Sequence, residues 1–430
     1  MKKILLSLFL SLLFTNDNIY SKSIQSIVIN GNNRTKEHII KREIMHPIDA
    51  PLDSLILTQD LNRLYNLGIF SMVDIYVEDQ IYYVDLVESF SILPLPIFEF
   101  DETNNHWTIG AAVGDINFLG LNQKLFLQGT FLGDKMYVMS LYNPWLFGDH
   151  ISLKFDMFNI YSENVFYDFF HYNTGYMIES GFYRGFKNKF KLKFGFYKNL
   201  IQEASLSYNL SDFLSDANLE HKYYLFNSNY QFDSRDIYID PTKGSFFQLD
   251  FRYYKGLDVD NFYTISALFK QYFSFKNTHS IFDNPVFSYK IYTLLKYPDY
   301  EKLPFFEYEY LGGEDYVRGY SSHPDKTLNQ TEHLIENSNI IYGSLEIQST
   351  LLERKDYGSR YRLGQGIEFG IDGFLFIDAG VGSKVYNNFI FENILVGYGF
   401  GLKFFILGGP PVSLSFGFNP YGTFEYHLSD

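Results

Sequence analysis

From about residue 97 onward the sequence repeatedly alternates apolar with polar or small residues, and this period of two constrains the fold most. In one run Phe190, Leu192, Phe194 and Phe196 alternate with Lys189, Lys191, Lys193 and Gly195. Later runs contain Phe247, Leu249, Phe251 and Tyr253, and then Val412, Leu414, Phe416 and Phe418. Successive side chains of a β-strand point to opposite faces of a sheet, so each run predicts a strand with one apolar face.

The aromatic content separates two classes of protein that contain such strands. A soluble β-sandwich also alternates, but 20% of this chain is aromatic, with 37 Tyr and 45 Phe. A transmembrane β-barrel places one face of each strand against lipid and carries aromatic girdles at both membrane interfaces. The sequence therefore favours a barrel over a sandwich.

Charge and motif content exclude several functions. The net charge of −15 argues against a nucleic-acid partner, because phosphate binding needs a basic surface. The absence of cysteine excludes disulfides. The sequence contains no Gly-x-Ser-x-Gly elbow, no His-Glu-x-x-His and no phosphate loop. We therefore expect a protein that is not an enzyme and that holds no cofactor or metal.

The N-terminus has the features of a secretory signal. Lys2 and Lys3 precede an apolar run, Ile4–Phe14, which is too short to span a bilayer as a helix. We expect residues 1–23 to be a signal peptide and the protein to be exported.

Residues 24–90 have a different pattern, which predicts the order β-α-α-β-β. A β-prone run, Ile24–Asn30, precedes Thr35, which is expected to cap a helix that Pro47 ends. Asp53 or Ser54 is expected to open a second helix, and two alternating runs follow around residues 73–77 and 82–86. The Leu93-Pro94-Leu95-Pro96 segment predicts an irregular linker over residues 91–96.

Residues 97–430 are expected to form sixteen antiparallel strands, an even number as bacterial barrels require. The expected strands span residues 97–103, 106–116, 120–132, 135–144, 150–161, 173–185, 188–200, 222–233, 245–256, 261–276, 285–297, 339–352, 367–380, 393–406, 411–419 and 421–428. If the first strand runs outward, connections after odd-numbered strands are extracellular. The longest of these, residues 298–338, follows the eleventh strand, and a connection of that length is usually functional or disordered.

That long connection contains Leu311–Tyr320, which places Arg318 at the tip of a glycine-flanked hairpin. Glu346 and Asp378 lie on the polar phase of the twelfth and thirteenth expected strands. A buried guanidinium needs acidic partners, and its planar fork suits two carboxylates. We expect the three residues to form a latch inside the lumen; the alternative is an ordinary exposed loop charge.

Two further motifs bear on the barrel. At Asp233-Ser234-Arg235-Asp236, followed by Pro241-Thr242-Lys243-Gly244, a strand is expected to end in a periplasmic turn whose charges pair and cap backbone groups. Gly397, Gly399 and Gly401 lie on one face of the fourteenth strand. They allow another segment to pack closely there or the barrel wall to bend.

Together these motifs resemble the outer-membrane assembly-factor superfamily, the BamA/TamA-like and bacterial surface antigen proteins. The Gly31–Thr35, Lys41–Ile44 and Leu64–Phe70 segments resemble a single polypeptide-transport-associated (POTRA) domain, and the Val317-Arg318-Gly319-Tyr320 loop, the Asp233–Gly244 turn and the Phe376–Gly380 strand resemble the barrel. The resemblance implies a mainly β protein: an N-terminal α+β POTRA domain followed by a sixteen-stranded transmembrane barrel. It also implies an outer loop folded into the lumen, with Arg318 held by Glu346 and Asp378, and a weak seam between first and last strands.

The function that the resemblance implies is insertion, assembly or translocation of polypeptides at the bacterial outer membrane, with the POTRA domain in the periplasm. Partners would be outer-membrane lipids and unfolded polypeptide clients, which POTRA domains bind by adding a strand to a sheet edge. Accessory subunits remain open. The alternatives are a two-partner-type secretion pore, a passive channel and a structural surface-antigen role.

Overall fold

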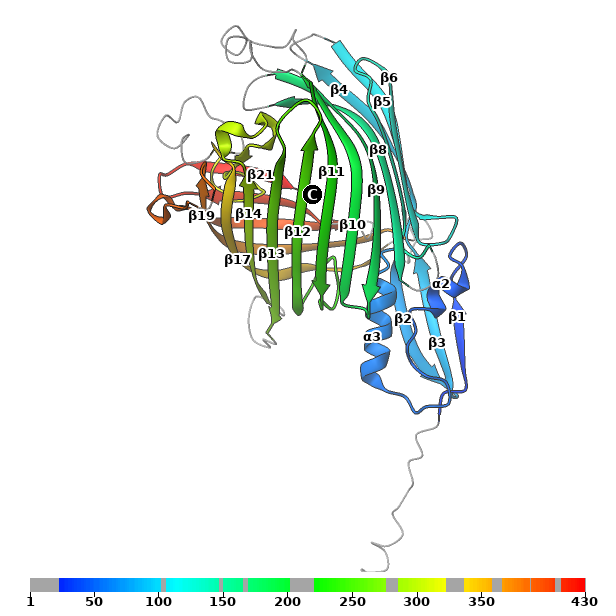
Figure 1. The fold of residues 1–430 in the computed structure, drawn as a ribbon. Helices are drawn as coiled ribbons and strands as arrows, with labels where there is room; N and C mark the ends of the chain where they lie inside the picture. Colours follow the sequence, from blue (N-terminus) through cyan, green and yellow to red (C-terminus); the bar gives the residue numbers. More distant parts are fainter. Residues whose placement is uncertain are drawn as a thin grey trace, which may run out of the picture.

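The computed structural model describes residues 23–101, 106–146, 150–164, 169–201, 220–275, 285–321, 336–357, 366–386, 388–406 and 411–429. The expected signal peptide, apart from Ser23, lies outside these ranges, as do residues 322–335 of the long connection. The described chain forms a small N-terminal domain and one large curled sheet, and the domain lies at one end of the sheet (Figure 1).

The N-terminal domain has the expected order of elements. These are β1 (Ser26–Asn30), α2 (Glu37–Lys41), α3 (Ser54–Tyr65), β2 (Phe70–Glu78) and β3 (Ile81–Glu88). The strands form a sheet in the order β1-β3-β2, with β1 parallel to β3. Asp60 of α3 is buried, and it accepts hydrogen bonds from the Met45 and His46 amides and the Tyr82 hydroxyl. This carboxylate ties α3 to the loop after α2 and to the sheet.

The two helices differ in how they begin. Asp53 caps α3 as expected, because its carboxylate accepts the amides of Leu55 and Ile56. Thr35 does not cap α2: the N-cap is Lys36, which makes no side-chain cap hydrogen bond, and the helix ends at Lys41, well before Pro47. The Thr35 hydroxyl instead accepts a hydrogen bond of 2.9 Å from Asn117 Nδ2 in the large sheet.

The large sheet contains sixteen strands, all paired antiparallel, which confirms the expected number. In chain order they are β4 (Ile92–Asp101), β5 (His106–Phe118), β6 (Gln123–Leu132), β7 (Tyr137–Asn143), β8 (Ile151–Asn164), β9 (Phe169–Arg184), β10 (Asn188–Ile201), β11 (Glu220–Asp233), β12 (Gly244–Gly256), β13 (Phe262–Ser274), β14 (Val286–Tyr297), β17 (Asn339–Asp356), β18 (Glu368–Ser383), β19 (Leu395–Ile406), β20 (Val412–Phe418) and β21 (Phe424–Ser429). Two short strands, β15 (Glu309–Tyr310) and β16 (Glu336–Asn337), pair with each other in the long connection between β14 and β17.

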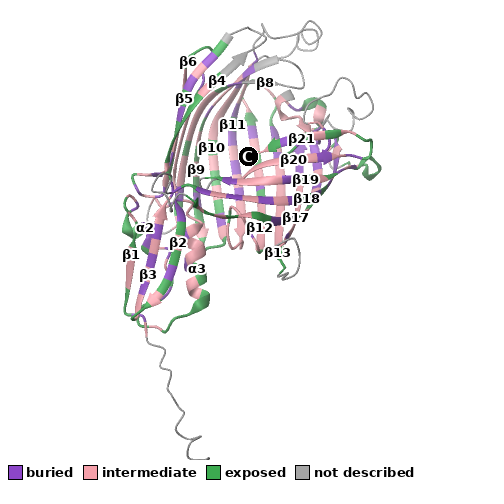
Figure 2. Cartoon of the chain, turned by 180° about the vertical axis from the view of Figure 1, so that it is seen from behind, coloured by how far each residue is buried: buried purple, intermediate pink, exposed green. Residues whose placement is uncertain are grey.

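Burial alternates along the strands of this sheet (Figure 2). On β18, Leu375 and Ile377 are each 54% exposed on the outer face, whereas Phe374, Phe376 and Asp378 are buried on the inner face. This is the pattern of a barrel wall whose outer face meets lipid. Among the residues that the structure describes, no helix is long and apolar enough to cross a membrane.

The first strand begins earlier than expected, and the irregular linker over residues 91–96 is wrong. Leu93-Pro94-Leu95-Pro96 belongs to β4 and pairs in continuous register with Ala111–Gly114 of β5. Proline lacks an amide hydrogen and is excluded from central strands, but it is tolerated on an edge strand when its nitrogen faces away from the partner. β4 stands at one end of the strand order and has only β5 as a neighbour. The position of a strand within a sheet is not visible in the local sequence.

Candidate functional site

The long connection packs against the inner face of the barrel wall around Arg318. Leu311 and Val317 are fully buried, and Tyr320 is nearly so. They form one apolar cluster with residues from the wall, namely Leu294, Ile340, Tyr342 and Leu395. The Val317 amide donates to the Leu311 carbonyl at 3.0 Å, which closes the hairpin that presents Arg318.

The structure brings Arg318, Glu346 and Asp378 together. Arg318 Nε and Nη2 donate to the two oxygens of Asp378 at 2.7 and 2.9 Å, and Nη1 lies 2.9 Å from Glu346 Oε1. The Arg318 amide also donates to Asp378 at 3.1 Å. The Asp378 side chain is 0% exposed and the Arg318 side chain 11% exposed, so both charges have been removed from bulk water. We call Arg318, Glu346 and Asp378 the latch.

Neighbouring groups satisfy the rest of the latch. Arg318 Nη2 donates to the Ser344 hydroxyl at 3.2 Å, and the Tyr342 hydroxyl donates to Asp378 at 3.3 Å. The guanidinium carbon lies 3.7 Å from the centre of the Phe376 ring, a cation–π contact. The second oxygen of Glu346 accepts from Lys403 Nζ at 2.8 Å. A buried ion pair holds only when its remaining hydrogen-bonding capacity is met, and here it is met.

The glycines of β19 make room for the latch. A Cβ atom on Gly397 would lie 1.7 Å from the Arg318 carbonyl oxygen. A Cβ atom on Gly401 would lie 2.4 Å from the Phe374 ring, and one on Gly399 would lie 2.8 Å from the Phe376 ring. The loop backbone and two aromatic rings therefore pack directly against the expected glycine face of β19.

Two anchors of the loop were not foreseen. Asn419 Nδ2, just after β20, donates to the Gly319 carbonyl at 2.7 Å. Lys296, at the end of β14, is buried and binds Glu307 and Glu309 at 2.9 and 2.7 Å. A lysine at the end of a strand, with two glutamates in the loop that follows, is a readable signal for the second anchor. Nothing in the sequence near Asn419 points to Gly319.

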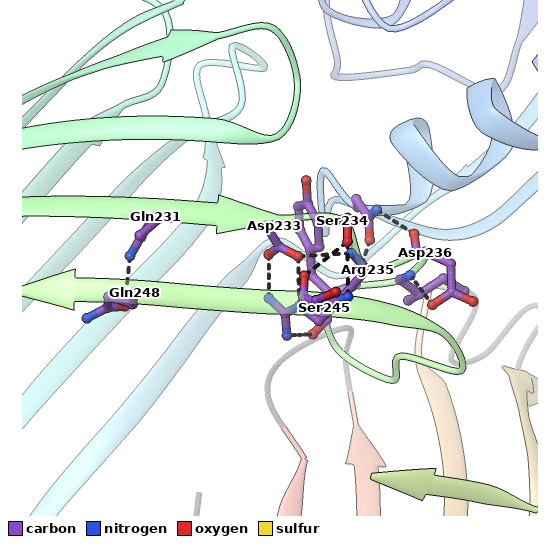
Figure 3. A network of polar contacts seen from close by, with 10 residues as sticks. Gln231, Asp233, Ser234, Arg235, Asp236, Ser245 and Gln248 are labelled. Carbon is purple, nitrogen blue, oxygen red and sulfur yellow. Dashed lines mark hydrogen bonds and ion pairs between the residues drawn. The ribbon is translucent and has the colours of Figure 1, made fainter. Parts of the chain in front are cut away.

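At the opposite end of the barrel, the expected periplasmic turn pairs its charges internally (Figure 3). Arg235 Nε and Nη2 donate to the two Asp233 oxygens at 2.9 and 2.6 Å. Asp236 accepts the amides of Ile237 and Thr242 and the Thr242 hydroxyl. Gly244 has a φ of +102°, and a Cβ atom there would lie 2.3 Å from the Ser234 carbonyl oxygen. Pro241 is buried.

This turn also contacts the N-terminal domain. Asn66, the C-cap of α3, donates to the Asp236 carbonyl at 2.9 Å and accepts from the Tyr238 amide at 2.8 Å. The reciprocal pair fixes the end of α3 on the barrel rim. The contact joins residues far apart in sequence, so the Asp233–Gly244 motif does not reveal it.

A second contact holds α3 to the base of β17 and β18. Arg354 Nε donates to Tyr65 Oη at 2.8 Å and to Glu368 Oε1 at 2.7 Å, and the Tyr65 hydroxyl contacts Glu368. Burial raises the pKa of the Tyr65 phenol well above its usual range, so the phenol is protonated at neutral pH and donates to the carboxylate. The Glu368 side chain is 4% exposed and depends on these two donors.

Replacing Arg354 by alanine is expected to weaken the contact of α3 with the barrel by about 1.5 kcal/mol, because the Tyr65 hydroxyl loses a charged donor. The N-terminal domain should then be released faster by limited proteolysis after residue 88. Lys355→Ala is the matched control, since Lys355 pairs with exposed Glu353 in solvent. Equal cleavage rates in the two variants would contradict a docking role for Arg354.

The latch, the turn and the N-terminal domain line one cavity of about 650 Å³. Its wall includes Arg318 and Glu346 of the latch, Asp240 and Pro241 of the turn, and Asn66–Gly68 of the N-terminal domain. The described parts of the chain contain no group of three side chains that could hold a metal ion. The long connection and the N-terminal domain thus both border this cavity.

Comparison with known proteins agrees with this architecture. The family model of the Omp85 superfamily domain matches residues 117–425, and the POTRA family model, described as a surface antigen variable number repeat, matches residues 22–89. No curated protein sequence matches the chain.

Two solved structures share the fold. BamA from Haemophilus ducreyi lacking POTRA domains 1–3 is 15% identical over 94% of this chain and 83% of that one, with a TM-score of 0.54. CdiB from Escherichia coli is 13% identical over 95% of this chain and 75% of that one, with a TM-score of 0.50. Omp85 proteins are outer-membrane barrels that insert or secrete polypeptides and carry POTRA domains in the periplasm. With a POTRA domain and a matching barrel, the chain belongs to the Omp85 superfamily.

Proposed function

We propose that this protein inserts polypeptide strands into the outer membrane through the seam between β4 and β21. The observation that carries the proposal is the strand order: it ends at β4 on one side and at β21 on the other, and no ladder joins them within the described residues. Each of these two strands therefore has one free edge. Unpaired edge groups are a template for an incoming strand.

Backbone hydrogen bonding supplies the driving force. Inside a bilayer an unpaired amide or carbonyl group is costly, so a client strand gains free energy by pairing with a free edge. The exchange needs no other energy source. The POTRA domain, fixed beside the barrel mouth by Asn66 and Tyr65, presents the client in extended form, and outer-membrane lipid receives it.

The latch has a supporting role in this proposal. It keeps the long connection against β17 and β18, so the strands on that side stay in register while the seam exchanges partners. The loop also fills part of the lumen, which disfavours a wide diffusion channel.

The test is the folding of an unfolded client barrel into liposomes with and without the purified protein. We expect acceleration that is lost in Arg318→Ala and after removal of residues 24–90. If the correctly folded protein does not accelerate client folding, the proposal is wrong. Large conductance together with transport of a soluble polypeptide would favour a two-partner-type secretion pore instead.

A further inference from the structure

The free edge of β4 has a polarity that follows from one hydrogen bond. The Ile116 amide of β5 donates to the Ser91 carbonyl at 3.0 Å, immediately before β4 begins. In an antiparallel pair the amide and carbonyl of one residue point to the same side, and successive residues alternate. Because the register from Ile92 to Asp101 is continuous, the odd-numbered residues of β4 face β5. The even-numbered residues therefore face the seam.

Two of these seam-facing positions are Pro94 and Pro96. Proline has a carbonyl but no amide hydrogen. The β4 edge thus offers a carbonyl acceptor at every seam-facing residue. It lacks amide donors at Pro94 and Pro96, the two successive seam-facing positions in the part of β4 near the POTRA domain. Donors return at Phe98 and Phe100.

The opposite edge has no such gap. The Asn419 amide lies 3.4 Å from the Thr423 carbonyl, so the odd-numbered residues of β21 face β20. The backbone groups of Phe424, Tyr426 and Leu428 therefore face the seam, and each of these residues has an amide hydrogen. The two edges are unequal, and the difference lies in β4.

We propose that Pro94 and Pro96 keep the half of the seam near the POTRA domain unpaired and confine strand pairing to the β4 edge from Phe98 outward. A partner strand laid along Pro94 and Pro96 would leave its own carbonyls without donors. In a membrane setting such unpaired groups oppose pairing. The inference rests on the proposed function, because it names where on β4 an extended client strand pairs and where that strand enters.

The segment before β4 contacts the segment before β18. The Phe90 amide, two residues before β4, donates to the Gly366 carbonyl at 3.1 Å, just before β18. In the strand order only β19, β20 and β21 separate β18 from the other free edge.

The test restores the donors. Pro94→Val/Pro96→Val supplies two amides that face the seam. Leu93→Val/Leu95→Val is the matched control, since it introduces the same side chains on the same strand at positions whose amides already face β5. The natural chain has no cysteine, so disulfide trapping reports on introduced pairs alone. A cysteine at Ile92 is combined with one at Leu428, and a cysteine at Phe98 with one at Phe424, because an antiparallel partner brings the end of β21 beside the start of β4.

In the protein that keeps both prolines, we expect a disulfide to form readily from a cysteine at position 98 and hardly at all from one at position 92. Restoring the donors should raise trapping from position 92 by about tenfold or more, the factor that two hydrogen bonds supply together. The Leu→Val control should leave both positions unchanged. Equal trapping from position 92 with and without the prolines would overturn the inference. Pro96→Val alone, with an intermediate effect expected, serves if the double variant does not fold.

A client assay then separates this inference from the proposed function. If the folded protein accelerates client insertion, Pro94→Val/Pro96→Val should slow insertion while the Leu→Val control does not. Unchanged insertion in the proline variant would overturn the role of the prolines in client entry. If the unaltered protein accelerates nothing, the insertion proposal fails, and disulfide trapping still decides whether the prolines hold the seam open.

Discussion

Replacing Arg318 by alanine is expected to lower the free energy of unfolding of the barrel by about 3–5 kcal/mol, the usual loss when one partner of a buried ion pair is removed. Asp378 is fully buried and would keep only the backbone amide of residue 318 at 3.1 Å and the hydrogen bond from Tyr342 at 3.3 Å, so it would lose both donors that carry a positive charge. Glu346 would be less affected, because Lys403 remains 2.8 Å away. Most of the loss should therefore arise at Asp378.

The measurement is thermal unfolding in detergent, followed by the heat-dependent shift of the barrel on gels and by protease sensitivity of the long connection. Arg252→Ala is the matched control. It also removes an arginine that pairs with a buried aspartate, Asp250, but the Arg252 side chain is 50% exposed. Asp250 would keep its hydrogen bonds from the side-chain amides of Asn227 and Asn229, each at 2.9 Å.

A loss of no more than about 1 kcal/mol is expected for the control, the range of exposed pairs. Equal losses in Arg318→Ala and Arg252→Ala would mean that the latch is not a stabilising element. Adding Asp378→Asn to Arg318→Ala should recover part of the loss, because the buried negative charge is then removed as well. If the double variant is no more stable than Arg318→Ala, the loss of stability does not arise from the unpaired charge of Asp378.

The sequence predicted the barrel strands well, because each strand of a membrane barrel reports its own two faces. Alternation between lipid-facing and lumen-facing residues is a local property, as on β10, where Phe190 and Leu192 are exposed and Lys189 is buried. A tally of such runs therefore gives the number of strands without knowledge of their neighbours. The pairing of Arg318 with Glu346 and Asp378 was foreseen for a related reason, since a lone arginine at a loop tip needs acids on the polar face of nearby strands.

Features that depend on neighbours were not predicted. Pro94 and Pro96 suggest a linker unless one knows that β4 is an edge strand with only β5 beside it. Thr35 looks like a helix cap until Asn117, which lies far along the chain, is seen to hold its hydroxyl. The contact of Asn419 with Gly319 likewise joins residues 100 positions apart. Each of these is a fact about tertiary arrangement rather than local pattern.

Gly397→Ala is expected to displace the loop tip and destabilise the barrel by about 3 kcal/mol, the upper end of the usual range for overpacking. The upper end applies because the added Cβ atom would lie 1.7 Å from the Arg318 carbonyl oxygen, and a backbone atom has no alternative rotamer into which it could move. The latch would have to shift as a unit, which stretches the bonds to Asp378 and the contact of Asn419 with Gly319.

Gly129→Ala on β6 is the control, because a Cβ atom there has no other atom within 4 Å. It should leave the melting temperature unchanged or raise it slightly. Gly397→Ala and Arg318→Ala disturb the same contact, so the loss in the double variant should be clearly smaller than the sum of the two single losses. Full additivity would show that Gly397 acts on the barrel by some route other than the latch.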